Sequence, residues 1–453
     1  MKRDPQAVKL NIAKLEFFER DVRLRMPFRF GVVTLTESPQ VFVRCRIRTE
    51  DGREAEGAAA ELLAPKWFDK NPALSNEDNY EQLRASLRAA RDKYLARGAA
   101  TAWQHSSPAQ LPPARGLVEN YGPALLDKAV LDALLRSLGI SFYQGIQHNV
   151  IGAEPFEGID LPAFFSTLKP AKTIAARHTV GMVDPITAAD QKERVNDGLP
   201  ETLEEVVERY GQRYFKLKVG GDVRADVERL SAITAVLDRI PGPYHASLDG
   251  NEQYEDMQGV AALWAAMKAA PRLRRLVDSV LFIEQPVKRQ MALERPVAGI
   301  DKPVIIDESD DSLDAFPRAK ALGYKGVSSK TCKGLYKSLI NRARCQAWGP
   351  EYFMSGEDLT IQAGLALQQD TALVSLLGLT HLERNGHQYV NGMADLPQAE
   401  QDAFLAAHPD LYERSHGAVR VRISNGELAI GSLDCKGYAS SAMPDWNSMR
   451  EMK

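Results

Sequence analysis

Three acidic residues that could bind a metal ion follow three consecutive apolar segments of the sequence. Asp249 ends the apolar part of YHASLDGN, Glu284 that of VLFIEQP, and Asp307 that of PVIIDES. Carboxylates are hard oxygen ligands, and without CxxC motifs or well-spaced histidines nearby they favour Mg²⁺, which binds oxygen atoms octahedrally. Together the three acids predict a magnesium site, whereas any one of them alone would more simply form a salt bridge.

Lysines flank this set of acids. The segment YFKLKVGGD places Lys216 and Lys218 on one face of a predicted strand, because side chains alternate along a strand. GVSSK adds Lys330 one predicted strand beyond Asp307. A lone KLK is typical of a solvated strand face, since lysine is rarely buried unless it is paired. Next to three acids, the lysines instead predict a cluster in which ammonium and carboxylate groups face one site.

The segments that carry these residues alternate with amphipathic segments from His178 onward. The strand candidates are HTVGMVD, YFKLKVG, YHASLDGN, VLFIEQP, PVIIDES, GVSSK, EYFMSG and LTHLER. Helical patterns lie between most of them: PETLEEVVERYGQR, RADVERLSAITAVLDRI, GVAALWAAMKAAPRLRRLV, GLYKSLINRARCQAW and LTIQAGLALQQDTALVSLL. Strands separated by helices in this way predict a closed parallel barrel rather than an open sheet. A barrel would bring the acids and lysines together at the C-terminal ends of its strands, where barrel enzymes place their chemistry.

The N-terminal part of the chain has a different pattern. Residues 8–60 alternate in polarity and contain the turn signal TEDG, which predicts antiparallel strands. Residues 75–98 and the segment GPALLDKAVLDALLRSLG predict two helices that each stop at a glycine, with the breaker-rich loop SSPAQLPPARG between them. After about residue 400, AVRVRIS and ELAIG predict a second antiparallel hairpin.

The charge and composition of the chain indicate which kinds of molecule it binds. The 453 residues include 57 Lys plus Arg and 60 Asp plus Glu, so no overall field favours nucleic acid or an anionic membrane. No segment has the pattern of a signal peptide or a membrane span, which predicts a cytoplasmic location. The cysteines lack CxxC spacing and are interpreted as reduced packing residues: Cys45, Cys332, Cys345 and Cys435. A small-molecule substrate fits these properties best.

The sequence resembles the enolase superfamily, and within it the muconate lactonizing enzyme-like branch of the mandelate racemase/muconate lactonizing enzyme family. That branch has KxK on barrel strand two, Asp, Glu and Asp on strands three to five, and Lys on strand six. The resemblance extends over nearly the whole chain through PFRFGVVTLTES, ALLDKAVLDALLRSLG, KLKVGGD, DGN, EQP, DES and KTCKGL. It implies an α/β fold, a modified TIM barrel (β/α)7β over residues 156–400, with an α+β N-terminal capping domain over residues 1–155. Residues 401–453 would pack on that capping domain.

The resemblance also implies a role for each predicted site residue. The residues that would bind Mg²⁺ are Asp249, Glu284 and Asp307. Lys218 would be the base on one face of the substrate and Lys330 the acid or base on the other, with Lys216 supporting Lys218 and helping to hold a carboxylate. Further candidates around the metal and substrate, for which a turn, core or surface role is the alternative, are Asn251, Glu308, Arg29, Glu357 and Glu383.

The implied chemistry is removal of the proton α to the carboxylate of a small-molecule acid, which gives a metal-stabilised enediolate. A neighbouring ammonium and a dication both favour the neutral form of Lys218 that a base requires. From the enediolate, racemisation or epimerisation, syn-elimination and cycloisomerisation all remain open. Strand seven, EYFMSGEDL, lacks the His of the mandelate racemase branch, and HLERNGHQYVNG lacks the DxD of dipeptide epimerases.

Two alternatives remain beside this interpretation: a sugar-acid dehydratase of the same superfamily, and a non-catalytic metal-binding barrel. The intact set of lysines and acids favours catalysis over the second. Residues 60–115 form a longer segment than a compact capping domain requires, and the sequence leaves its role open. The substrate is also left open, and a homo-oligomer is expected only because family members often form one.

Overall fold

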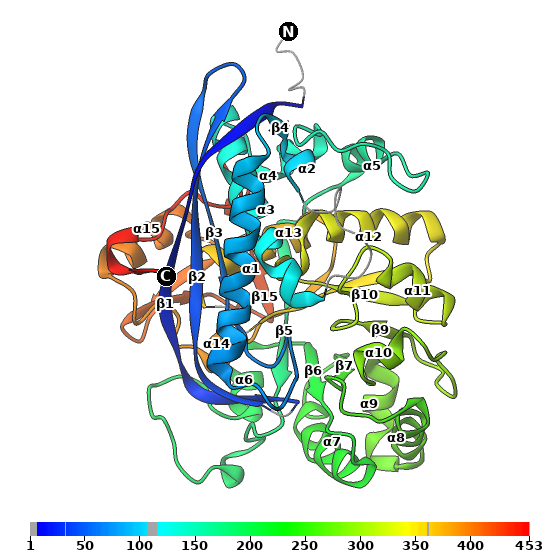
Figure 1. Cartoon of the computed structure of the whole chain (residues 1–453). Coiled ribbons are helices and arrows are strands. Elements are labelled where there is room, and N and C mark those ends of the chain that lie inside the picture. Colours follow the sequence, from blue (N-terminus) through cyan, green and yellow to red (C-terminus); the bar gives the residue numbers. More distant parts are fainter. Residues whose placement is uncertain (1–6, 32, 107–115, 360–361, 453) are drawn as a thin grey trace.

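The computed structural model describes residues 7–31, 33–106, 116–359 and 362–452. It contains an antiparallel sheet with helices, formed mainly by the N-terminal third of the chain, and a parallel barrel (Figure 1). Most of the predicted loop SSPAQLPPARG falls outside the described residues. No helix within the described ranges combines the length and apolarity needed to cross a bilayer.

The N-terminal sheet confirms the strands predicted from alternating polarity. Its strands β1 (Lys9–Phe30), β2 (Val33–Thr49) and β3 (Glu54–Leu62) pair antiparallel in this order. β1 also pairs with two short strands, β4 (Ala100–Thr101) and β16 (Arg450–Glu451). The C-terminal end of the chain therefore returns to the N-terminal sheet, as the position of the C label beside β1 in Figure 1 shows.

Two long helices cover this sheet and confirm the predicted ones. The helix α1 (Asn76–Ala96) begins with a capping box, in which the Ser75 hydroxyl accepts from the backbone N–H of Asp78 and the Asp78 carboxylate accepts from that of Ser75. The helix α3 (Leu117–Leu138) ends at Gly139, whose φ of 70° lies in the left-handed region that glycine adopts without strain. α3 packs on β2, β3 and α1. The shorter helices of this part are α2 (Ala102–His105), α4 (Phe142–Gln147) and α5 (Leu161–Thr167).

The contact between β3 and α3 depends on Gly57. A Cβ atom at this position would lie 2.2 Å from the Ala133 backbone nitrogen and 2.5 Å from the Ala129 carbonyl oxygen, so no side chain fits. We expect Gly57→Ala to lower the free energy of unfolding by about 1–3 kcal/mol, the usual cost of overpacking, in denaturant titrations. Gly116→Ala is the matched control, because no atom of the other described residues lies within 4 Å of its Cβ position. Equal losses for the two variants would contradict this close packing.

Among the described residues, eight parallel strands form a closed barrel, because the last of them pairs with the first. In chain order they are β5 (Thr173–Val180), β6 (Tyr214–Lys218), β7 (His245–Asp249), β8 (Val280–Glu284), β9 (Val304–Ile306), β10 (Gly326–Ser329), β11 (Phe353–Gly356) and β12 (His381–Glu383). The intervening helices are α6 (Leu203–Tyr210), α7 (Val223–Leu237), α8 (Met257–Ala269), α9 (Arg274–Ser279), α10 (Arg289–Ala292), α11 (Ala315–Ala321), α12 (Leu335–Trp348) and α13 (Leu365–Leu376). The first seven strands are each followed by at least one of these helices before the next strand, and β12 closes the ring before the one-turn helix α14 (Gly386–Tyr389), which confirms the predicted (β/α)7β architecture.

The predicted pairing of AVRVRIS with ELAIG is wrong. β14 (Ala418–Val421), within AVRVRIS, pairs antiparallel with β13 (Tyr412–Ser415), whereas β15 (Glu427–Ala429) pairs with β5 of the barrel. The turn between β13 and β14 contains His416 and Gly417, both with positive φ, as in the tight turns that match the twist of paired strands. Because of this tight turn, β14 pairs with β13, which directly precedes it. β15 pairs with β5 instead and so joins the barrel sheet. The helix α15 (Gln398–Ala407) precedes this hairpin.

Two predicted barrel elements have different bounds in the structure. HTVGMVD contributes only its first three residues to β5, because Gly181 begins a turn in which its backbone N–H donates to the Asp184 carboxylate at 2.7 Å. The helix predicted over 359–377 starts only at Leu365, after Gly364 with a φ of 119°. The predicted domain boundaries at residues 155 and 400 stay predictions.

Candidate active site

The pairing register aligns the predicted acids and lysines at one rim of the barrel. Lys218 pairs with Asp249 across β6 and β7, and Asp249 pairs with Glu284 across β7 and β8. Glu284 pairs in turn with Ile305, so that Asp307 follows β9 just beyond this level. The residues therefore meet at the C-terminal ends of neighbouring strands, as a parallel barrel requires.

Lys216 lies at the centre of the charged cluster. Its Nζ is 2.7 Å from Glu357 Oε2, 2.8 Å from Glu284 Oε2, 2.9 Å from Asp249 Oδ2 and 3.1 Å from Glu383 Oε2, and its side chain is 1% exposed. Burial opposes its ionisation, but the four carboxylates outweigh burial and raise the pKa of Lys216 well above its ordinary value. Lys216 thus joins acids from four strands, a wider role than the predicted support of its neighbour.

Lys218 and Lys330 lie on opposite sides of the barrel lumen. Lys218 is the last residue of β6, and Lys330 comes directly after β10. These two strands are four apart in the closed ring of eight that the described residues form. The ammonium of Lys218 donates to Asp249 Oδ2 at 2.5 Å and to Asn251 Oδ1 at 2.6 Å. Lys330 donates to Asp307 Oδ2 at 2.8 Å. A substrate between the two ammonium groups would present one face to each.

The three predicted metal ligands differ in their electrostatic surroundings. Burial raises the pKa of Glu284 well above its ordinary value, and the charges of Asp249 and Glu357 raise it further. Burial also disfavours ionised Asp307, but Lys330 and then Lys333 lower the pKa of that carboxyl below its usual range. Of these two carboxylates, that of Glu284 is therefore the one that the surrounding side chains compensate less.

The chemistry of these three acids fits a divalent cation. Glu284 Oε2 is buried and, within the described part of the chain, accepts no hydrogen bond of good geometry, although Lys216 Nζ is 2.8 Å away. A cation would compensate this oxygen and reduce the repulsion between the acids. In the described ranges no three Asp, Glu, His or Cys side chains converge with metal-site geometry, and the Lys216 ammonium lies 2.9 Å from Asp249 and 2.8 Å from Glu284.

Asn251 and Glu308 extend the cluster toward the capping domain. Asn251 accepts from Lys218, and its Nδ2 donates to Glu308 Oε1 at 3.2 Å. Glu308 is fully buried and also accepts from Lys70 at 3.1 Å, so the alternative of an exposed glutamate does not apply. Lys70 comes from the segment whose role the sequence left open, and no pattern in the sequence marked it.

The remaining predicted candidates divide into two groups. Glu357 and Glu383 are buried beside Lys216, where Arg177 donates to Glu357 and Thr179 donates to Glu383. Arg29, in contrast, is exposed, because side chains alternate along β1 and those of Phe28 and Phe30 take the inward positions. The structure therefore brings the two glutamates to the site and leaves the Arg29 side chain outside it.

A small pocket lies between the capping domain and the barrel mouth. From the capping side it is lined by Phe28, Phe30, Leu35, Ala64 and Trp67, and from the barrel side by Lys216, Lys218, Asn251, Lys330, Asp358, Leu359, Glu383 and Asn385. The Trp67 ring centroid lies 4.3 Å from Lys330 Nζ, and the Phe28 ring centroid lies 6.0 Å from Lys218 Nζ. Sequence reasoning missed Trp67, Asp358 and Asn385, because only the fold brings their segments together.

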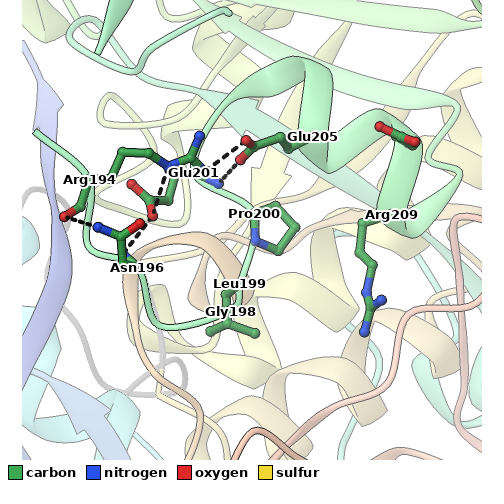
Figure 2. Close-up of a pocket in the computed structure, with 9 residues that line it drawn as sticks. Arg194, Asn196, Gly198, Leu199, Pro200, Glu201, Glu205 and Arg209 are labelled. Carbon is green, nitrogen blue, oxygen red and sulfur yellow. Dashed lines mark hydrogen bonds and ion pairs between the residues drawn. The ribbon is translucent and has the colours of Figure 1, made fainter. Parts of the chain in front are cut away.

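A second pocket is open to the surface and lies on the loop that precedes α6 and on α6 itself (Figure 2). Its charged side chains pair with one another: Arg194 lies 2.7 Å from Glu205, and the Glu201 carboxylate accepts from the backbone N–H groups of Val195 and Asn196. None of the predicted lysines or acids of the barrel mouth lines this pocket. The cavity under the capping domain is therefore the candidate active site.

The fold and site define a (β/α)7β-barrel protein with a capping domain and its polar residues at the barrel mouth. Residues 198–422 match the family model of the enolase C-terminal domain-like type. The chain belongs to the enolase superfamily, in its mandelate racemase/muconate lactonizing enzyme group. A search of curated protein sequences finds no match.

Solved structures of this superfamily have the same fold over almost the whole chain. Muconate lactonizing enzyme from Pseudomonas fluorescens complexed with muconolactone is 17% identical, with a TM-score of 0.62 over 96% of this chain and 97% of that one. A magnesium-complexed enolase superfamily member from Roseovarius nubinhibens ISM is 18% identical, with a TM-score of 0.59 over 98% and 99%. The L-Ala-D/L-Glu epimerase from Bacillus subtilis is 15% identical, with a TM-score of 0.59 over 93% and 98%. At these identities the likeness shows the fold.

Proposed function

We propose that this protein is a Mg²⁺-dependent enzyme that removes the proton α to the carboxylate of a small-molecule acid. The observation that carries the proposal is the placement of Lys218 and Lys330 on opposite sides of one cavity, with buried acids between them. The magnesium-complexed relative, the epimerase and the muconate lactonizing enzyme support it. The products would be those of an isomerase or a lyase.

The reaction begins with proton transfer to a neutral lysine. The amine of Lys218 takes the α-proton and becomes an ammonium, while the electron pair of the broken C–H bond enters the carboxylate to give an enediolate. Asp249, Glu284 and Asp307 would hold Mg²⁺, which when bound supplies positive charge to offset the charge that develops on the substrate carboxylate.

The second step decides the product. If the Lys330 ammonium delivers a proton to the opposite face of the α-carbon, the configuration inverts and Lys330 becomes neutral. If a β-substituent departs with its electron pair, a double bond forms and the reaction is an elimination. In either case Phe28 and Trp67 cover the two ammonium groups and limit the access of water to the reacting carbon.

Proton exchange in D₂O tests the proposal without knowledge of the product. The protein with Mg²⁺ is incubated with pools of carboxylic acids, and loss of the α-proton signal is followed by NMR. We expect at least one acid to exchange its α-proton, and chelation of Mg²⁺ to stop the exchange. A protein that binds Mg²⁺ but exchanges no acid in any pool would instead support a non-catalytic barrel.

A further inference from the structure

The two halves of the active-site cavity differ sharply in polarity. Of the described residues, those that line it from the capping domain carry no charged side chain: Phe28, Phe30, Leu35, Ala64 and Trp67. The barrel half holds the lysines and acids at which the proton would be moved. A substrate whose α-carbon lies between the lysines therefore places its remaining substituent against an apolar, mainly aromatic surface. Burial of an apolar group against this surface is favourable.

The acids that border this apolar surface already have donors. Asp358 Oδ1 accepts from the backbone N–H of Leu359 at 2.7 Å, and Oδ2 accepts from that of Asn385 at 3.0 Å. Glu383 accepts from Lys216, Thr179 and the Asn385 side chain. An ammonium group on the substrate would compete with these donors, and a polyhydroxylated chain would leave several hydroxyls unpaired against aromatic rings. Both arrangements are costly in a buried site.

Two buried polar atoms of the cavity lining have no hydrogen-bond partner within the described residues. One is a donor, Trp67 Nε1, on a side chain that is 3% exposed. The other is an acceptor, Asn385 Oδ1, on a side chain whose Nδ2 donates to Glu383 at 3.0 Å. Buried polar groups are nearly always paired, so these two atoms point to a ligand that supplies one acceptor and one donor.

Trp67 is held in place by the barrel rather than by its own loop alone. Arg289 donates to the Trp67 carbonyl at 3.0 Å and to the Phe68 carbonyl at 2.9 Å, and it pairs with Glu252 at 2.9 Å. Lys70, three residues further along, lies 2.6 Å from Glu252. These contacts fix the indole over Lys330 before any substrate binds. Such preorganisation favours one class of ligand.

We propose that the substrate is a carboxylic acid that carries an uncharged, largely apolar substituent and one donor–acceptor group, such as a hydroxyl or an amide, and that Trp67 selects it. This inference rests on the proposed function, because it assumes that the α-carbon lies between the lysines. It assigns a role to the segment around residue 67, within the region whose length the sequence left unexplained.

The first measurement uses acids that share one skeleton. Isothermal titration of the Mg²⁺-loaded protein is performed with 3-phenylpropanoate and with its 2-hydroxy, 2-acetamido and 2-ammonio derivatives, and with gluconate. We expect the hydroxy or acetamido acid to bind about 3–10-fold more tightly than the parent, the gain of one or two hydrogen bonds. The ammonio acid and gluconate should bind more weakly than the parent. Tightest binding of either of these two would overturn the proposal.

The second measurement uses Trp67→Phe, which keeps an aromatic ring over Lys330 but removes the N–H. This variant should bind the favoured acid about 3–10-fold more weakly and should bind the parent acid, 3-phenylpropanoate, with unchanged affinity. Trp446, whose ring packs against that of Phe18, does not line the cavity; Trp446→Phe is therefore the matched control and should change the binding of neither acid. Equal weakening of both acids by Trp67→Phe would mean that Trp67 acts by packing alone, against the proposal.

These outcomes are separate from those of the proposed function. If no acid exchanges its α-proton, the proton-abstraction proposal fails, whatever the titrations show. If acids do exchange but the ammonio acid or gluconate binds most tightly, only the proposed class of substrate is wrong.

Discussion

Replacing Lys218 by methionine is expected to lower α-proton exchange of one substrate enantiomer by about 10²–10⁴-fold, the usual contribution of a general base. Exchange of the other enantiomer, whose α-proton faces Lys330, should change far less. Lys330→Met should instead slow exchange of the other enantiomer and change that of the first far less, because the two lysines lie on opposite sides of the lumen. Exchange rates of each enantiomer in D₂O, measured by NMR, check both statements.

The lysine variants are expected to fold, because each carboxylate keeps a second ammonium. Without Lys218, Asp249 retains Lys216 at 2.9 Å, and without Lys330, Asp307 retains Lys333 at 3.3 Å. Lys268→Ala, a surface lysine paired with Asp301, controls for general effects of removing a lysine. If either active-site variant slows both enantiomers equally, the assignment of one face to each lysine is contradicted.

Replacing Glu284 by glutamine is expected to weaken Mg²⁺ binding by at least about 10–100-fold, which is the cost of losing even an outer partner of a metal site. The same variant should be no less stable than the parent chain without metal. The pKa of Glu284 is raised in the folded chain, so at a pH above its ordinary pKa this acid lowers the free energy of unfolding, whereas a neutral amide does not. Titration calorimetry gives the affinity, and thermal unfolding in chelator gives the stability.

Asp358→Asn is the matched control for this second prediction. Asp358 is a buried acid of the same cavity, but backbone N–H groups already pair with its oxygens. The Asp358→Asn variant should bind Mg²⁺ with an affinity within about threefold of the parent value, since a group that does not bind the ion contributes little. A Glu284→Gln variant that binds Mg²⁺ like the parent would remove Glu284 from the metal site. A variant that loses stability in chelator would contradict the raised pKa of Glu284 in the folded chain.

The barrel and the rim of the site were predictable because they follow from local patterns. Apolar runs such as YFKLK and VLFIE alternate with amphipathic segments, and a parallel barrel brings the ends of all such runs to one rim. The positions of Asp249, Glu284 and Lys330 at that rim needed no information beyond their place at the ends of strands. β14 shows the limit of pattern alone, since alternating polarity marks a strand but does not choose its partner.

The arrangement within the site was less predictable because it depends on contacts between distant segments. Lys216 contacts Glu357 and Glu383 across the barrel, and no spacing in the sequence relates these residues. Trp67 lies over Lys330, and its backbone carbonyl accepts from Arg289, although these three residues are far apart in the sequence. Arg29 was expected near the substrate from its motif, but the direction of alternation along β1 exposes it.

Whether Lys218 and Lys330 move the α-proton is best measured as deuterium incorporation at the α-carbon of an exchanging acid, compared between the parent protein and the Lys218→Met/Lys330→Met variant. We expect the parent protein with Mg²⁺ to incorporate deuterium. The double variant, shown to bind Mg²⁺, should incorporate none above the rate in buffer. Incorporation by the double variant at the parent rate would contradict this expectation, because the proton would then be moved by a group other than these lysines.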